Sequence, residues 1–119
     1  MSDMSEVYSV NDHFLNKDPS VRSLYDHLLV ALREFGPIHE EPKKTSIHLV
    51  NRSALAGVEV RKNYLLLNIK SDHKIDSPRI EKAEQISAGR FHHKVKLSLP
   101  NDLDAELVAW LRAAYELSG

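Results

Sequence analysis

The sequence predicts an α+β domain, in which an antiparallel sheet of about five strands carries N-terminal and C-terminal helices packed on one face. Apolar residues recur at helical spacing in residues 18–36 and again after residue 102. Residues 45–99, between these segments, show the two-residue alternation of half-buried strands. Two amphipathic helices can cover one face of such a sheet, which leaves the other face to solvent.

Both helices are predicted from caps and apolar spacing. Asp18 is a candidate N-cap, Pro19 suits the first helical turn, and Gly36-Pro37 ends the first helix. Pro100-Asn101-Asp102 is expected to end the last strand and to cap the second helix. Residues 1–17 are expected to be an extension, partly disordered or with a short helix over Val10–Leu15, and residues 18–119 a single domain. The apolar stripes consist of Val21, Leu24, Tyr25, Leu28, Leu32 and Phe35, and of Leu103, Leu107, Trp110, Leu111 and Ala114.

Five strands are predicted between the helices, over Thr45–Val50, Ala56–Arg61, Tyr64–Lys70, Ile80–Ser87 and Phe91–Leu99. The fourth segment also fits a short helix, but the turn at Ala88-Gly89-Arg90 favours a hairpin with the fifth. Alternation directs one set of side chains toward the helices: Ile47, Leu49, Val58, Val60, Leu67, Ile69, Val95 and Leu97. The open face then receives His48, Glu59, Arg61, Asn68, Lys70, His92, Lys94 and Lys96.

The net charge of −1 conceals a strong segregation along the chain. Residues 1–42 hold three Lys or Arg against eight Asp or Glu, residues 43–96 hold twelve against five, and residues 97–119 hold one against four. We therefore expect positive charge on the sheet and negative charge on the flanking helices. This pattern indicates that the sheet binds anionic partners.

The composition excludes several classes of protein. The chain has no cysteine, which removes disulfides, thiolate metal sites and cysteine nucleophiles. Its acidic, polar N-terminus lacks the features of a signal peptide. The longest apolar runs, Leu28–Leu32 and Leu107–Leu111, are far shorter than a membrane span. We expect a cytoplasmic protein without membrane association.

Several cations on the predicted sheet are candidates for anion binding. Lys43 and Lys44, with Thr45 and Ser46, place two charges and two hydroxyls where a strand begins, although a solvated strand start needs no ligand. Arg61 on the open face and Arg79, after Pro78, carry the planar guanidinium that suits anions. The alternative for Arg79 is a structural salt bridge, to Asp76 or Glu81. His48, Lys70, Lys94 and Lys96 are further candidates on the open face.

His92 and His93 resemble a metal motif, but neighbouring residues of a strand point to opposite faces and cannot readily share an ion. We predict that His93 is a hydrogen-bonded core histidine. His92 is expected on the open face, where it could bind an anion when protonated or act as an acid or base. The sequence lacks ligand spacing for a metal and glycine loops for a nucleotide, so we expect neither a metal nor another cofactor.

Four stretches together resemble a known family. They are Glu41–Ile47 (EPKKTSI), Ala56-Gly57-Val58 followed by Arg61-Lys62, Ile75–Ile80 (IDSPRI), and Asp102-Leu103-Asp104 leading to Trp110-Leu111. As a set, over roughly residues 18–117, they resemble a bacterial family of domains of unknown function that is sometimes described as predicted transport proteins. The resemblance implies an α+β fold, and it brings no established activity or catalytic residues.

The sequence therefore predicts a small binding or interaction module whose basic sheet face takes an anionic partner. The partner would be a nucleic acid, a phosphorylated small molecule or an acidic protein surface, although the open face offers only Tyr64 for stacking on bases. Homodimerisation also fits, through acidic helices on a basic sheet or through exposed strand edges. The alternative is a metal-dependent nuclease-like or hydrolytic enzyme using Glu59, Arg61 and His92.

Overall fold

A computed structural model describes residues 8–119 and confirms the predicted α+β architecture, with a six-stranded antiparallel sheet. The expected disorder of residues 1–7 lies outside the described residues. The elements are, in chain order, η2 (Asn11–Phe14), α1 (Pro19–Arg33), β1 (His39–Pro42), β2 (Ile47–Val50), β3 (Ala54–Val60), β4 (Leu65–Ser71), β5 (Ile80–Ser87), β6 (Arg90–Leu97), η3 (Pro100–Asp102) and α2 (Ala105–Leu117).

Helix α1 begins where the sequence predicts. The Asp18 carboxylate accepts a hydrogen bond from the Ser20 N–H (3.2 Å), and Pro19 occupies the first position of the helix. The predicted stripe from Val21 to Leu32 is buried. Phe35 lies just beyond the helix, where its ring packs 5.9 Å from that of Tyr115.

The strands lie in the order β1-β2-β3-β4-β6-β5, so the β5–β6 hairpin turns back and places β6 against β4. Ile80–Ser87, the segment with two interpretations, is a strand. Our count of about five strands was one short, because His39–Pro42 pairs with β2 and forms an edge of the sheet. A strand that ends in proline is tolerated there, since an edge strand has one unpaired side.

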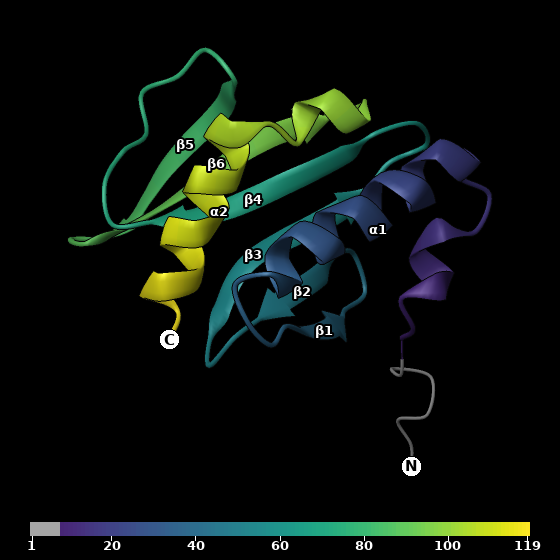
Figure 1. Ribbon diagram of the computed structural model, residues 1–119, viewed down its shortest axis with the longest axis horizontal. Coiled ribbons are helices and arrows are strands. Elements are labelled where there is room, and N and C mark those ends of the chain that lie inside the picture. The colour runs from purple at the N-terminus through teal and green to yellow at the C-terminus, as the bar shows by residue number, and fades with distance from the viewer. Residues whose placement is uncertain (1–7) are drawn as a thin grey trace.

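Both helices cover the same face of the sheet (Figure 1). The register sets Ile47, Val58, Leu67 and Val95 side by side across β2, β3, β4 and β6, and all four are buried beneath the helices. The prediction for the covered face is confirmed, with Val60 only partly buried at its margin. The opposite face has no helix over it in the described chain.

The second helix starts later than predicted. Asp102 does not cap it, because the Asp102 carboxylate accepts the N–H groups of Ser98 (2.7 Å) and Leu99 (3.0 Å) and closes the short turn η3. The N-cap of α2 is Asp104, which accepts the N–H of Leu107 (3.0 Å). No helix within residues 8–119 is long and apolar enough to cross a membrane.

The expectation that negative charge resides on the helices is wrong for α1. That helix carries Arg22 and Arg33 against Asp26, whereas Glu40 and Glu41 belong to the edge strand β1. Most acidic residues between positions 8 and 42 therefore flank α1, and part of the sheet is acidic. A count along the sequence cannot separate a helix from the loops and strand beside it.

Candidate functional site

The open face of the sheet carries the polar side chains that the alternation placed there. The register aligns His48, Gly57, Asn68 and Lys94 across β2, β3, β4 and β6. Two residues further along β4, Lys70 lies opposite His92 of β6, and both side chains point to the open face. Residues from four strands are thus brought together although up to 46 positions separate them in the sequence, as His48 and Lys94 show.

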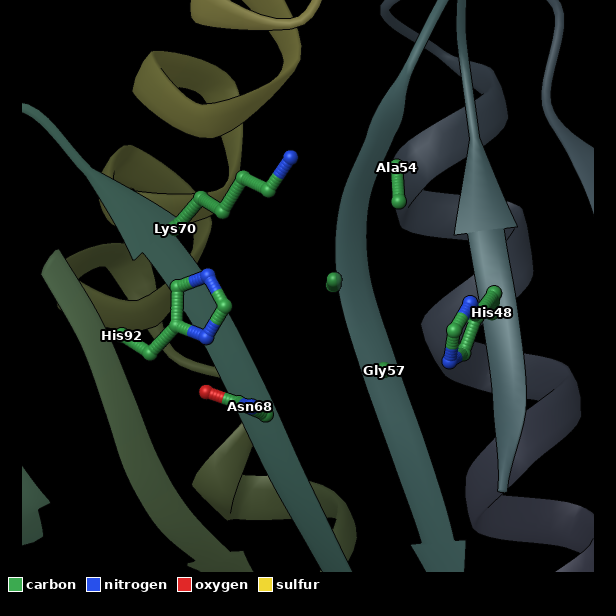
Figure 2. A pocket seen from close by; sticks show the side chains of 7 residues that line it. His48, Ala54, Gly57, Asn68, Lys70 and His92 are labelled. Atoms are coloured by element: carbon green, nitrogen blue, oxygen red, sulfur yellow. The ribbon is translucent and has the colours of Figure 1, made fainter. Parts of the chain in front are cut away.

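A small pocket of about 90 Å³ opens on this face, between the β2 and β6 histidines (Figure 2). Its floor is β3, where Gly57 has no side chain and Ala54 has a short one. A Cβ added to Gly57 would lie 3.8 Å from Cδ2 of His48, which is an ordinary van der Waals contact. A side chain at this position would therefore fit sterically, and its absence leaves space in the pocket. The lining residues are His48, Ala54, Ala56, Gly57, Asn68, Lys70 and His92.

The side-chain oxygen of Asn68 lies buried at this pocket and accepts no hydrogen bond from the described residues. In Figure 2 this oxygen points to the side of the pocket where His92 stands. Leaving a buried acceptor unpaired costs about 1–3 kcal/mol. An unpaired polar atom in a pocket wall is therefore a position where a ligand can contribute a donor.

Lys70 is the one lysine or arginine that lines the pocket, and it forms none of the ion pairs found among residues 8–119. Burial and the charge of Lys70 lower the pKa of His92, while Glu84 opposes them. His92 is therefore neutral at pH 7, with one ring N–H to donate and one ring nitrogen to accept. An anion bound beside Lys70 would offset its charge and favour protonation of His92.

Other predicted cations on the open face are already paired. Glu59 lies between two of them, with Oε1 at 2.7 Å from Arg61 Nη2 and Oε2 at 3.6 Å from Lys94 Nζ. Lys96 Nζ lies 4.5 Å from the centre of the Tyr64 ring. The basic face is therefore narrower than predicted, because Glu59 offsets the charges of Arg61 and Lys94.

The segment before β2 stands apart from the pocket. Lys43 closes the turn between β1 and β2, with its backbone N–H donating to Ser46 O (2.7 Å), and its Nζ lies 3.8 Å from Glu41. Lys44 and Ser46 belong to the same turn and do not line the pocket. Lys43, Lys44 and Ser46 therefore do not contribute to the pocket that His48, Lys70 and His92 line.

Arg79 has a structural role on the other side of the sheet. Its guanidinium donates to Asp104 Oδ1 (2.7 Å) and Asp102 O (2.7 Å), with Glu106 at 3.4 Å. Arg79 therefore forms a structural salt bridge, as the alternative interpretation predicted. Its partners are Asp104 and Glu106 at the start of α2, however, and not Asp76 or Glu81. Arg79 therefore ties the β4–β5 loop to α2.

His93 is the hydrogen-bonded core histidine that the alternation predicts. It is fully buried, its Nε2 accepts the N–H of Ile75 (3.0 Å), and its Nδ1 lies 3.4 Å from Ile69 O. Since Nε2 accepts, Nδ1 carries the proton, and burial lowers the pKa of the ring. No group of three His, Cys, Asp or Glu that could hold a metal occurs in the described chain.

Four of the seven lining residues were not among the candidates, and the sequence contained weaker signals for two of them, Gly57 and Asn68. A glycine inside a strand marks a place where a ligand or another backbone can approach, and Gly57 is such a residue. Asn68 interrupts the apolar β4 strand, and asparagine is uncommon in strands. Neither signal shows by itself that Asn68 Oδ1 lacks a partner, which depends on the neighbouring strands.

Comparison with protein families finds one family model, for a domain of unknown function, DUF5655, that matches residues 10–118. No significant match is found among curated proteins or among solved structures. The match spans η2 through α2, so it includes every element that builds the pocket.

Proposed function

We propose that this chain, which belongs to the DUF5655 family of domains of unknown function, is a binding module that holds a small anionic group in its open-face pocket. The observation that carries the proposal is Lys70, a cation without a carboxylate partner in residues 8–119, at a pocket that two histidines also line. A hydrogen bond between an ammonium and an anion is stronger than a neutral one, most of all where water is partly excluded.

The pocket accounts for a small ligand better than for a polyanion. At about 90 Å³ it is smaller than the sites that enclose drug-sized molecules, so it suits a single group. Nucleic acid would need a row of free cations and stacking rings. On this face Arg61 and Lys94 already contact Glu59, and Lys96 covers Tyr64.

The enzyme alternative draws less support from the same contacts. A nuclease-like site would need Glu59 to hold a metal ion, but each of its carboxylate oxygens already faces a cation. Nuclease activity that requires magnesium and is lost in Glu59→Gln would establish the enzyme in place of the binding module.

The test of the binding proposal is a titration with inorganic phosphate, followed by amide chemical shifts and by calorimetry. A hydrogen bond to a charged group contributes about 1.5–3 kcal/mol, so Lys70→Ala should weaken phosphate binding about tenfold or more. Lys62→Ala, which removes the same charge from the exposed β3–β4 turn, should leave the affinity unchanged. The proposal fails if neither phosphate nor a small carboxylate such as glycolate shifts an amide near His48, Gly57, Asn68 or His92, or if Lys70→Ala binds like the parent.

We also propose that the chain self-associates by pairing two β5 strands. β5 is an edge strand that is mostly exposed, with Ile86 52% exposed. Within one copy Lys82 faces Lys94 of β6, and like charges opposite each other are unfavourable. An antiparallel pair of β5 strands centred on Ala83 would set Lys82 of each copy opposite Glu84 of the other.

A further inference from the structure

We infer that the anion held in this pocket carries its own hydrogen-bond donor, as hydrogen phosphate does. The inference rests on the anion-binding function proposed above and narrows its ligand. It comes from two groups that require different partners. Lys70 carries positive charge and donates hydrogen bonds, whereas Asn68 Oδ1 can only accept one.

A fully deprotonated anion would satisfy Lys70 but not Asn68. Its oxygens would be repelled by the amide oxygen, which is already buried from water, so the acceptor would stay unpaired. A ligand with an O–H or N–H beside its anionic oxygens meets both groups at once. Asn68 then accepts the ligand's proton, while Lys70 and the N–H of neutral His92 donate to the anionic oxygens.

The size of the pocket restricts the class further. A volume of about 90 Å³ suits a tetrahedral oxyanion or a two- or three-carbon hydroxycarboxylate. The shared chemistry is an anion with an adjacent hydroxyl. Two pairs of probes distinguish its sources: phosphate with sulfate, and glycolate with acetate.

Phosphate and sulfate make a sharp comparison because they share a shape and differ in the proton. At neutral pH inorganic phosphate keeps at least one O–H, whereas sulfate has none and carries at least as much negative charge. A pocket that reads charge alone would bind sulfate as tightly as phosphate or more tightly. We expect the parent protein to prefer phosphate by about fivefold to a hundredfold, because sulfate leaves a buried acceptor unpaired.

Asn68→Leu tests the origin of the preference. It removes the acceptor at similar volume, so phosphate should lose its advantage while sulfate binding stays the same or tightens. Gly57→Val is the matched control, since it fills the pocket floor and should weaken both anions alike. Because the parent's preference needs no substitution, the test holds even if Asn68→Leu does not fold.

The outcomes separate the two proposals. A preference for phosphate over sulfate, or for glycolate over acetate, that Asn68→Leu abolishes supports the inference and identifies which source of the hydroxyl the pocket takes. Equal binding within both pairs, with Lys70→Ala still weakening it, overturns the inference and leaves the anion-binding function standing. Absence of binding by all four probes overturns both.

Discussion

His93 on β6 binds the backbone of Ile75 in the β4–β5 loop through a neutral ring. The free energy of unfolding should therefore depend on pH. The folded protein holds the ring without charge, because burial lowers its pKa and Nε2 must remain free to accept from Ile75. In the unfolded chain the pKa returns to its ordinary value of about 6.5. As pH falls below about 6.5, the unfolded state takes up this proton first, so the free energy of unfolding should decrease until the folded pKa is passed.

Urea unfolding at pH 7.5 and pH 5.5 measures this effect. His92 also has a lowered pKa and would add a change of the same sign, so the comparison belongs in a His92→Gln background. There we expect lower stability at pH 5.5, and a smaller difference after His93→Gln. A His93 ring that titrates at or above its ordinary pKa, followed by NMR, would contradict the assignment.

Individual side chains were predictable where a strand's alternation alone decides their direction. His48, Lys70 and His92 were placed outward and His93 inward from a two-residue period, and the register confirms all four. The partners were not predictable. Arg79 forms its salt bridge with Asp104, 25 positions away. The sequence suggested Asp76 or Glu81 instead, because only residues close along the chain can be recognised as contacts without the fold.

Between elements, the connection from α1 to β1 depends on a glycine without a side chain. Gly36 has φ of 154°, and a Cβ there would overlap the hydroxyl of Tyr115 on α2. That hydroxyl donates to Pro37 O (3.4 Å), so the loop and α2 meet closely at this point. Gly36→Ala should destabilise the fold by about 1–3 kcal/mol, through backbone strain and through the overlap.

Denaturant unfolding of a double-mutant cycle separates these two causes. Tyr115→Phe removes the overlapping oxygen, so Gly36→Ala should cost less in that background, and the remainder reports the backbone strain. Gly89→Ala is the matched control, because a Cβ at Gly89 meets nothing within 4 Å. Equal costs for Gly36→Ala and Gly89→Ala would refute the close approach.

Among the elements, those with a clear period were predicted well and those with few residues were not. Helix α1 and the β5–β6 hairpin follow from caps, apolar spacing and a turn. Strand β1, with the sequence His-Glu-Glu-Pro, has no alternation of apolar residues and becomes a strand only because β2 offers it hydrogen bonds. The start of α2 was misplaced because Asp102 and Asp104 are equally good caps, and the turn η3 decides between them.

Over the whole molecule, positive charge is less concentrated than its distribution along the sequence indicates. β1 brings Glu41 beside His48, and Glu59 lies against two cations in the middle of the open face. What remains is a local site around Lys70, not a basic surface. This is why we propose a small anion where the sequence alone admitted nucleic acid and acidic proteins.

The edge strand β5 gives a prediction about assembly. If two copies pair there, light scattering should show a dimer whose population rises with concentration. Glu84→Lys should weaken the dimer, because it sets a lysine opposite Lys82, and the exchange Lys82→Glu with Glu84→Lys should restore it. A dimer indifferent to Glu84→Lys would exclude this register, and a monomer at all concentrations would exclude the pairing.

The insertion of β6 between β4 and β5 also has a consequence for the order in which a nascent chain can finish its fold. When synthesis has passed β5, the apolar strand β4 still lacks its second neighbour, since Leu65–Ser71 must wait for Phe91–Leu97. The same late strand delivers His92 to the pocket. A ligand that needs this pocket can therefore bind only after β6 has joined the sheet, so occupancy of the site would report that the sheet is complete.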